Sequence, residues 1–138
     1  MQFDADRRIR DRVEAMATSL KRKPALVLLA WSILYFATTL TLSSKKLLWD
    51  DEFFTLNLSR IPRFSDLWKA LLTGADQHPP LFYRLTHASM SVFGTSQIGL
   101  RLPSMLGFWI LTLCVFTFVS RRTSTLYGYV AMLAICLT

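Results

Sequence analysis

Two long runs of uncharged, mostly apolar residues constrain this 138-residue chain more than any other feature. Residues 24–42 contain no Asp, Glu, Lys, Arg or His over nineteen positions, and residues 102–119 contain none over eighteen. At a rise of about 1.5 Å per residue, helices of this length approach the ~30 Å thickness of the hydrocarbon core of a bilayer. The sequence therefore predicts two transmembrane helices, which we place at residues 24–44 and 100–120.

A third uncharged run, residues 123–138, reaches the last residue of the sequence after sixteen positions, which is short for a full span. No polar flank closes this run. We therefore expect residues 121–138 to begin a third, truncated transmembrane helix, and the chain to be part of a larger protein or a truncated gene product. The first run is too long for a signal peptide and lacks a small-residue cleavage pattern, so an uncleaved anchor is favoured.

The distribution of charge argues against binding to nucleic acid. The net charge is +7, but seven of the sixteen basic residues lie in residues 1–23, directly before the first apolar run. No aromatic residues are interleaved with these charges, and the positive-inside rule explains them instead. We interpret residues 1–23 as a basic cytoplasmic amphipathic segment, with an ordinary solvated helix as the alternative. Its apolar stripe consists of Ile9, Val13, Met16 and Leu20.

The basic residues also predict the orientation of the chain in the membrane. Arg121 and Arg122 close the second apolar run, and the basic N-terminal segment precedes the first. The positive-inside rule therefore places both of these flanks in the cytoplasm. Residues 45–99 then form an extracytoplasmic loop, although seven further basic residues between positions 43 and 101 reduce the contrast between the two sides.

The sequence of this loop predicts short helices. Residues 51–59 form a helix-compatible run, and the acidic residues at its start suit a helix N-terminus. A second helix is expected to end at Leu72, with Ser65 and Asp66 as its N-cap and first turn and Gly74 beyond it as a stop.

Two prolines, Pro79 and Pro80, predict the start of a third short helix. One face of this helix carries Leu81, Leu85, Ala88 and Val92. The predicted fold class is therefore all-α integral membrane, with two complete transmembrane helices, a truncated third and short juxtamembrane helices in the first outer loop.

Three consecutive acidic residues are the first candidates for chemistry. Asp50, Asp51 and Glu52 lie between Trp49 and Phe53, close to the predicted end of the first transmembrane helix. Most acidic triplets are solvated helix starts, and that alternative stays open here. Partial removal from water near the headgroups would raise the pKa of a carboxylate toward the range of a useful base.

Two cationic candidates follow in the chain. His78 lies in a turn stiffened by two prolines, and Arg101 opens the second apolar run, where the ordinary role of an arginine is to reach the membrane surface. Arg84, Lys69 and His87 are further candidates with more ordinary structural roles. A carboxylate base combined with cations suits sugar transfer from a phosphate-linked donor, because the phosphate is already a stable leaving group.

The order and the residue identities of these motifs resemble the N-terminal part of the GT-C membrane glycosyltransferases over roughly residues 24–122. The matching segments are Trp49–Thr55 (WDDEFFT), His78–Tyr83 (HPPLFY), Phe93–Gly94 and Leu100–Ser104 (LRLPS). The branch that this chain resembles most holds the protein mannosyltransferases and the bacterial aminoarabinose and galacturonic-acid transferases, in glycosyltransferase family 39. The resemblance implies inverting transfer of a sugar from a polyprenyl-phosphate donor to a lipid, glycan or protein acceptor, on the extracytoplasmic face of a bacterial inner membrane.

The same resemblance implies roles for individual residues. Asp51 and Glu52 match the acidic pair of the family, which makes them the expected catalytic residues and Asp51 the expected base. His78 faces the phosphate of the sugar donor, and Arg101 matches the arginine that opens the next span. The resemblance leaves Asp50 outside the acidic pair; from the residues alone, Asp50 and Arg84 are added to the expected substrate-binding set. Family members run to several hundred residues, so we expect the 138-residue chain alone to be inactive without its C-terminal remainder.

Two other functions compete with this hypothesis. A small non-catalytic membrane protein would pair with partner helices, for which Ser104 and Gly107 offer one pair of small residues. A channel or transporter fragment is disfavoured because neither complete run carries an ionisable residue near its centre.

The sequence leaves the metal requirement open. Carboxylates and a phosphate can share a divalent cation, but no ligand spacing here indicates such a site. Cys114 and Cys136 lie in apolar runs without a CxxC pattern, which predicts buried free thiols rather than a disulfide or a metal site.

The orientation can be tested by cysteine labelling. In a chain with both natural cysteines replaced by serine, Asp66→Cys is expected to react with a membrane-impermeant thiol reagent in intact cells, and Arg10→Cys is expected to be protected. Labelling at position 10 with protection at position 66 would reverse the proposed orientation.

Overall fold

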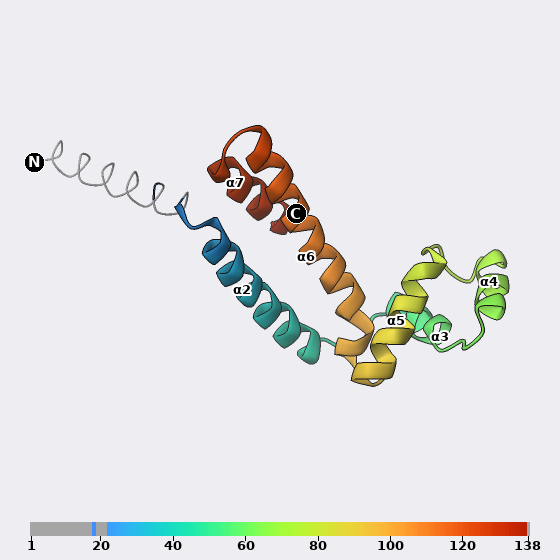
Figure 1. Ribbon diagram of the computed structural model, residues 1–138. Coiled ribbons are helices and arrows are strands. Elements are labelled where there is room, and N and C mark those ends of the chain that lie inside the picture. Colours follow the sequence, from blue (N-terminus) through green and yellow to red (C-terminus); the bar gives the residue numbers. More distant parts are fainter. Residues whose placement is uncertain (1–17, 19–21, 138) are drawn as a thin grey trace, which may run out of the picture. The chain divides into compact units, whose positions relative to one another are not determined.

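The structure is a computed structural model that describes residues 18 and 22–137. This part of the chain is helical and contains no strand, which confirms the all-α class there (Figure 1). Its helices are α2 (Pro24–Lys45), α3 (Asp50–Ser59), α4 (Phe64–Leu72), α5 (Pro80–Phe93), α6 (Gln97–Arg122) and α7 (Thr125–Cys136). The amphipathic helix expected within residues 1–23 lies almost entirely outside the described residues.

Two of the described helices, α2 and α6, are long and apolar enough to cross a membrane. They contain 22 and 26 residues, whereas α7 is a shorter apolar helix of 12 residues. α6 begins at Gln97, three residues before the predicted span, so its first turn and Arg101 lie ahead of the uncharged run. The chain divides into two compact units, Met1–Tyr35 with Trp109–Thr138 and Phe36–Phe108, which we describe separately.

In the unit Phe36–Phe108, the three short helices α3, α4 and α5 share a small core. Leu58, Leu67 and Tyr83, one from each helix, are buried against one another. On α5 the buried face also includes Thr86 and Met90. The apolar face expected from the sequence is instead exposed, with Leu81, Leu85 and Val92 each more than half accessible.

The start of α4 differs from the expectation. The N-cap is Arg63, whose carbonyl accepts hydrogen bonds from Asp66 and Leu67, so Ser65 lies inside the helix and the predicted Ser65 cap is wrong. The helix includes Phe64 because the ring of Phe64 stacks on that of Trp68 one turn later, with centroids 6.2 Å apart.

The end of α4 agrees with the expectation for Gly74. Gly74 adopts φ +82°, and its N–H donates to Leu71 O at 3.0 Å while Ala75 N–H donates to Ala70 O at 3.3 Å. These two bonds form a Schellman motif, which requires a residue with positive φ at this position.

Pro103 lies inside α6, where it removes one backbone donor. The carbonyl that loses its partner four residues earlier is that of Gly99, and the Ser89 hydroxyl of α5 donates to it at 2.7 Å. A Cβ atom at Gly99 would collide with the carbonyl oxygen of Gly94, so the lack of a side chain permits this close turn between α5 and α6. The proline is thus accommodated by a neighbouring helix.

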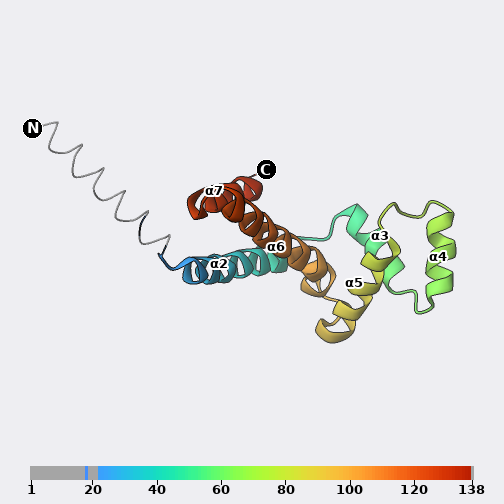
Figure 2. The ribbon, with the colours of Figure 1, turned by 45° about the horizontal axis from the view of Figure 1, so that its top comes forward.

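In the other unit, α6 and α7 form an antiparallel hairpin, and α7 lies beside α6 in both views (Figures 1 and 2). Phe116, Tyr129 and Met132 are its buried core, and the rings of Phe116 and Tyr129 stack with centroids 5.0 Å apart. Trp109 Nε1 donates to Ser32 Oγ of α2 at 2.9 Å. The two helices approach closely at Gly128, where a Cβ atom would lie 3.0 Å from Phe116 and from Ser120.

The two cysteines are free, as expected, but they are exposed rather than buried. Cys114 lies on α6 and Cys136 ends α7. Location in an apolar run does not predict burial, because only part of the circumference of a helix packs against its neighbours.

Replacing Gly128 should destabilise the hairpin. A Cβ at Gly128 would lie 3.0 Å from the side chain and the backbone oxygen of Phe116, so Gly128→Leu forces the two helices apart. We expect a loss of about 1–3 kcal/mol in the free energy of unfolding, measured by titration with SDS in mixed micelles. Gly107→Leu is the matched control, since a Cβ there meets nothing within 4 Å. Equal effects of the two substitutions would contradict this account.

Candidate functional site

A single guanidinium joins three helices of the unit Phe36–Phe108. Arg101, in the second turn of α6, donates from Nε to Glu52 Oε1 at 2.6 Å and from Nη2 to Glu52 Oε2 at 2.7 Å. This is the bidentate geometry in which arginine holds a carboxylate most firmly. The ion pair links α6 to the first turn of α3.

The remaining N–H groups of Arg101 cap the end of α2. Nη1 donates to the carbonyl oxygens of Ser43 at 2.9 Å and Lys46 at 3.1 Å, and Nη2 donates to that of Leu47 at 3.0 Å. The last carbonyls of a helix have no partner within the helix, and a cation is favoured there by the helix dipole. All five N–H groups of Arg101 are therefore engaged by acceptors of the protein.

Gln97, in the first turn of α6, supports the same helix end. With its amide nitrogen toward α2, Gln97 donates to the carbonyl oxygens of Ser43, Ser44 and Lys46, at 2.9, 3.2 and 3.1 Å. The orientation of this amide follows from its surroundings, which offer acceptors to the nitrogen. The polar first turns of α6 thus hold the chain where α2 ends and α3 begins.

Glu52 is fixed as an ionised group. Besides Arg101, the backbone N–H of Trp49 donates to Glu52 Oε2 at 3.0 Å, so the side chain also caps the start of α3. The hydrogen bonds from Arg101 lower the pKa of the Glu52 carboxyl, burial opposes them, and the Trp49 N–H lowers it further. A carboxylate with both oxygens occupied and a lowered pKa is a poor base, so Glu52 is suited to positioning rather than to proton transfer.

Asp51 and Asp50 are both exposed, but they differ in their position relative to the cavity described below. Asp51 is exposed, its Oδ1 accepts the backbone N–H of Glu52 at 3.0 Å, and its side chain lines the cavity described below. Asp50 is exposed at the start of α3 and does not line that cavity. Of the three acids, Asp51 is therefore the one placed to accept a proton from a molecule in the cavity.

His78 is held by a carboxylate that the sequence analysis did not select. Its Nδ1 lies 3.3 Å from Asp76 Oδ1, and Asp76 also accepts the Tyr83 hydroxyl at 2.7 Å and the Gln77 N–H at 2.7 Å. Contact with an ionised carboxylate makes Nδ1 the donor nitrogen and leaves Nε2 as the nitrogen available to another molecule.

The pKa values of Asp76 and Tyr83 reflect this network. Burial raises the pKa of Asp76, but hydrogen bonds from Tyr83, Gln77 and His78 outweigh burial and bring it below its ordinary value. Burial and the hydrogen bond to Asp76 raise the pKa of the Tyr83 hydroxyl well above its ordinary value. The network therefore contains an ionised Asp76 and a neutral Tyr83 at neutral pH.

The sequence motifs meet at one cavity of about 200 Å³, which we call the site cavity. Asp51 and Glu52 reach it from α3, His78 from the turn before α5, and Arg101 from α6. The full lining is Asp51, Glu52, Thr55, His78, Phe82, Leu100, Arg101 and Ser104.

Two predicted site residues lie elsewhere. Asp50 is outside the site cavity, and Arg84 donates from Nη1 to Pro62 O at 3.2 Å, which ties α5 to the loop before α4. His87 likewise lies within hydrogen-bonding distance of a backbone carbonyl, that of Ser59, at 2.7 Å. The side chains of Arg84 and His87 therefore stabilise the packing of the short helices.

Other residues of the site were not selected from the sequence. Thr55, Phe82 and Ser104 line the site cavity, and Asp76 holds His78. Asp76 precedes His78 by two residues, and this spacing was the signal available for it. Thr55 and Ser104 close the WDDEFFT and LRLPS segments, but the sequence alone gave neither of them a role in the site.

The chemistry open to this site follows from its charges. One free carboxylate, one oriented imidazole and one fixed ion pair surround a cavity large enough for a small polar group. Among the described residues, no cluster of three or more His, Cys, Asp or Glu side chains is placed to hold a metal ion. Comparison of the chain with known protein families, with curated proteins and with solved structures finds no match.

The Arg101–Glu52 ion pair should make the free energy of unfolding depend on pH in the acidic range. Because the pKa of Glu52 is lowered on folding from its ordinary 4.5, its contribution is present above about pH 4.5 and is lost as the pH falls through the lowered value. Glu52→Gln should therefore show a smaller fall in the free energy of unfolding than the natural chain as the pH is lowered below about 4.5, measured by denaturation in detergent at several pH values. An unchanged pH dependence would contradict the assignment.

Proposed function

We propose that this chain forms part of an integral membrane glycosyltransferase that takes its sugar from a polyprenyl-phosphate donor. The observation that carries the proposal is the convergence of Asp51, Glu52, His78 and Arg101 on one cavity. Such a reaction needs a base for the acceptor hydroxyl and positive charge near the departing phosphate. The resemblance of the WDDEFFT, HPPLFY and LRLPS segments to the GT-C transferases supports the same conclusion.

In this proposal Asp51 accepts the proton of the acceptor hydroxyl as the new glycosidic bond forms. His78, held by Asp76 through Nδ1, acts in its doubly protonated form and donates from Nε2 to the phosphate of the sugar donor. Glu52 and Arg101 form the frame that holds the α3 acids in place. The sequence places Arg101 among the cations expected to hold the phosphate, and that role remains a prediction. Since all five N–H groups of Arg101 are given to the protein, we favour positioning as its main role.

The exposed apolar surface fits a substrate carried by lipid. In this proposal α2 and α6 cross the membrane, and the short helices lie at its extracytoplasmic surface. Phe53, Phe54, Phe64 and Trp68 are about half exposed or more. Aromatic side chains favour the boundary between lipid and water, where Arg60 and Arg63 beside them also reach phosphate headgroups. A polyprenyl-phosphate donor would present its phosphate at this depth, next to the site cavity.

The role of Asp51 is tested by Asp51→Asn in the enzyme that carries this segment. The amide keeps the shape of the side chain and removes its charge and basicity. We expect a loss on the order of 10²–10⁴-fold in turnover, with the protein still folded in the membrane. The measurement is transfer of radiolabelled sugar from a panel of polyprenyl-phosphate donors, with circular dichroism as the test of folding.

Two control variants sharpen this test. Asp50→Asn should have a much smaller effect, because Asp50 does not line the site cavity. His78→Ala should raise the KM for the sugar donor more than it lowers kcat, since the phosphate is contacted both before and during transfer. Near-normal turnover of Asp51→Asn would remove Asp51 from catalysis and return the acidic cluster to the role of a solvated helix start.

A further inference from the structure

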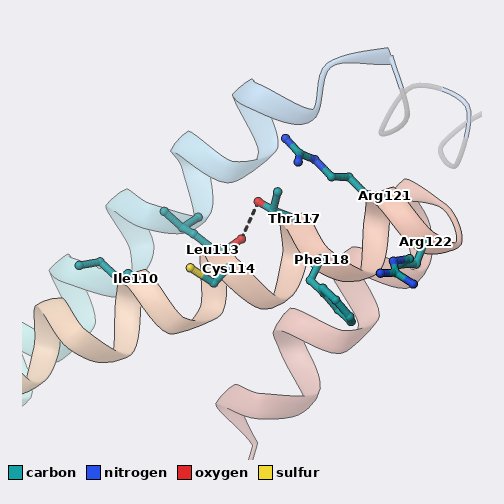
Figure 3. A pocket seen from close by; sticks show the side chains of 7 residues that line it. All are labelled: Ile110, Leu113, Cys114, Thr117, Phe118, Arg121 and Arg122. Carbon is teal, nitrogen blue, oxygen red and sulfur yellow. Dashed lines mark hydrogen bonds between the residues drawn. The ribbon is translucent and has the colours of Figure 1, made fainter.

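A second hollow lies on α6 in the unit Met1–Tyr35 with Trp109–Thr138, and it belongs to no part of the site above. We call it the α6 groove; its volume is about 630 Å³ (Figure 3). Its lining residues are Ile110, Leu113, Cys114, Thr117, Phe118, Arg121 and Arg122. Their spacing of three and four residues places them along one continuous face of the helix.

The groove has the length of one leaflet. From Ile110 to Arg121 the helix rises by roughly 16 Å at about 1.5 Å per residue, which is about half of the ~30 Å hydrocarbon core. The lining is apolar except for its basic end. Thr117 does not make the middle polar, because its hydroxyl donates to Leu113 O at 2.8 Å within the helix. A hydrocarbon chain would therefore meet suitable surface along this length.

The basic end of the groove carries positive charge without a described counterion. Arg121 and Arg122 are both exposed, and the guanidinium of Arg122 lies 5.4 Å from the ring centroid of Phe118. Residues 22–35 and 109–137, which make up nearly all of this unit's described part, contain no Asp or Glu. Their basic residues include Arg22 and Lys23, so the described part of the unit is strongly cationic.

We propose that the α6 groove binds one anionic phospholipid. Its acyl chain follows the face from Phe118 to Ile110, and its phosphate pairs with Arg121 and Arg122. The guanidinium of arginine can donate two parallel hydrogen bonds to one phosphate, and basic residues at the end of an apolar helix attract anionic lipids. The proposal needs no sugar donor or transferase activity, so it stands or fails apart from the proposed function.

Photo-crosslinking identifies the occupant directly. The chain carrying p-benzoylphenylalanine in place of Phe118 is placed in nanodiscs of phosphatidylglycerol and phosphatidylcholine in equal amounts, irradiated and analysed by mass spectrometry. We expect phosphatidylglycerol adducts to exceed phosphatidylcholine adducts by roughly 25-fold, about fivefold for each arginine. The same probe in place of Leu111, which is exposed on α6 but outside the groove, should capture the two lipids in near-equal amounts.

Substitutions then test the role of charge. Arg121→Gln with Arg122→Gln should bring the adduct ratio at position 118 to within about twofold of the bulk lipid ratio, whereas Arg121→Lys with Arg122→Lys should keep most of the preference. Arg60→Gln with Arg63→Gln, in the other unit, should leave the ratio unchanged. Equal capture of both lipids at position 118, crosslinks to peptide alone, or no lipid adduct would each overturn the proposal; peptide capture would show that a helix fills the groove.

Discussion

The guanidinium of Arg101 is the interaction on which the unit Phe36–Phe108 depends. It compensates the charge of Glu52 and completes the hydrogen bonding of the carbonyls at the end of α2. Removing it would leave the partly buried Glu52 carboxylate without its counter-charge and the Leu47 carbonyl without its Arg101 donor, which costs more than the loss of an exposed ion pair. One side chain thus fixes the end of an apolar helix, the start of α3 and the direction of the α3 acids.

This arrangement separates two carboxylates that are adjacent in the chain. Glu52 is held ionised and saturated by Arg101, whereas Asp51 lines the same cavity and remains exposed. The two ring nitrogens of His78 differ in the same way: Nδ1 contacts Asp76, and Nε2 is the nitrogen that a ligand would contact. In the function we propose, positioning groups and reacting groups are therefore distinct, and the reacting groups lie on short helices fixed at their ends.

The exposed apolar surfaces have a consistent physical explanation if lipid surrounds the helices. Leu81, Leu85 and Val92 on α5 and Phe118 on α6 would be unfavourable in water, where each exposed large side chain costs about 1.5–3 kcal/mol relative to burial. In a bilayer they meet hydrocarbon, and packing between helices then depends on close approach and on hydrogen bonds. Gly128 against Phe116 and Trp109 to Ser32 are contacts of this kind.

Features that depend on local properties of the chain were readable from the sequence. Uncharged runs set α2 and α6, Pro80 set the start of α5, and Gly74 set the end of α4, because hydropathy, fixed φ and positive φ act within a few residues.

Tertiary structure decided how those elements and the site residues meet. Asp51, His78 and Arg101 are up to fifty positions apart in the chain, and only the packing of α3, α5 and α6 brings them to one cavity. The sequence motifs identified these residues but not their proximity. The partners of Arg101, the Asp76 contact and the buried face of α5 were not readable from sequence. The physical reason is that hydrogen-bond partners and buried faces depend on which elements the fold brings close together. Sequence periodicity identifies the apolar face of a helix but not the element that packs against it.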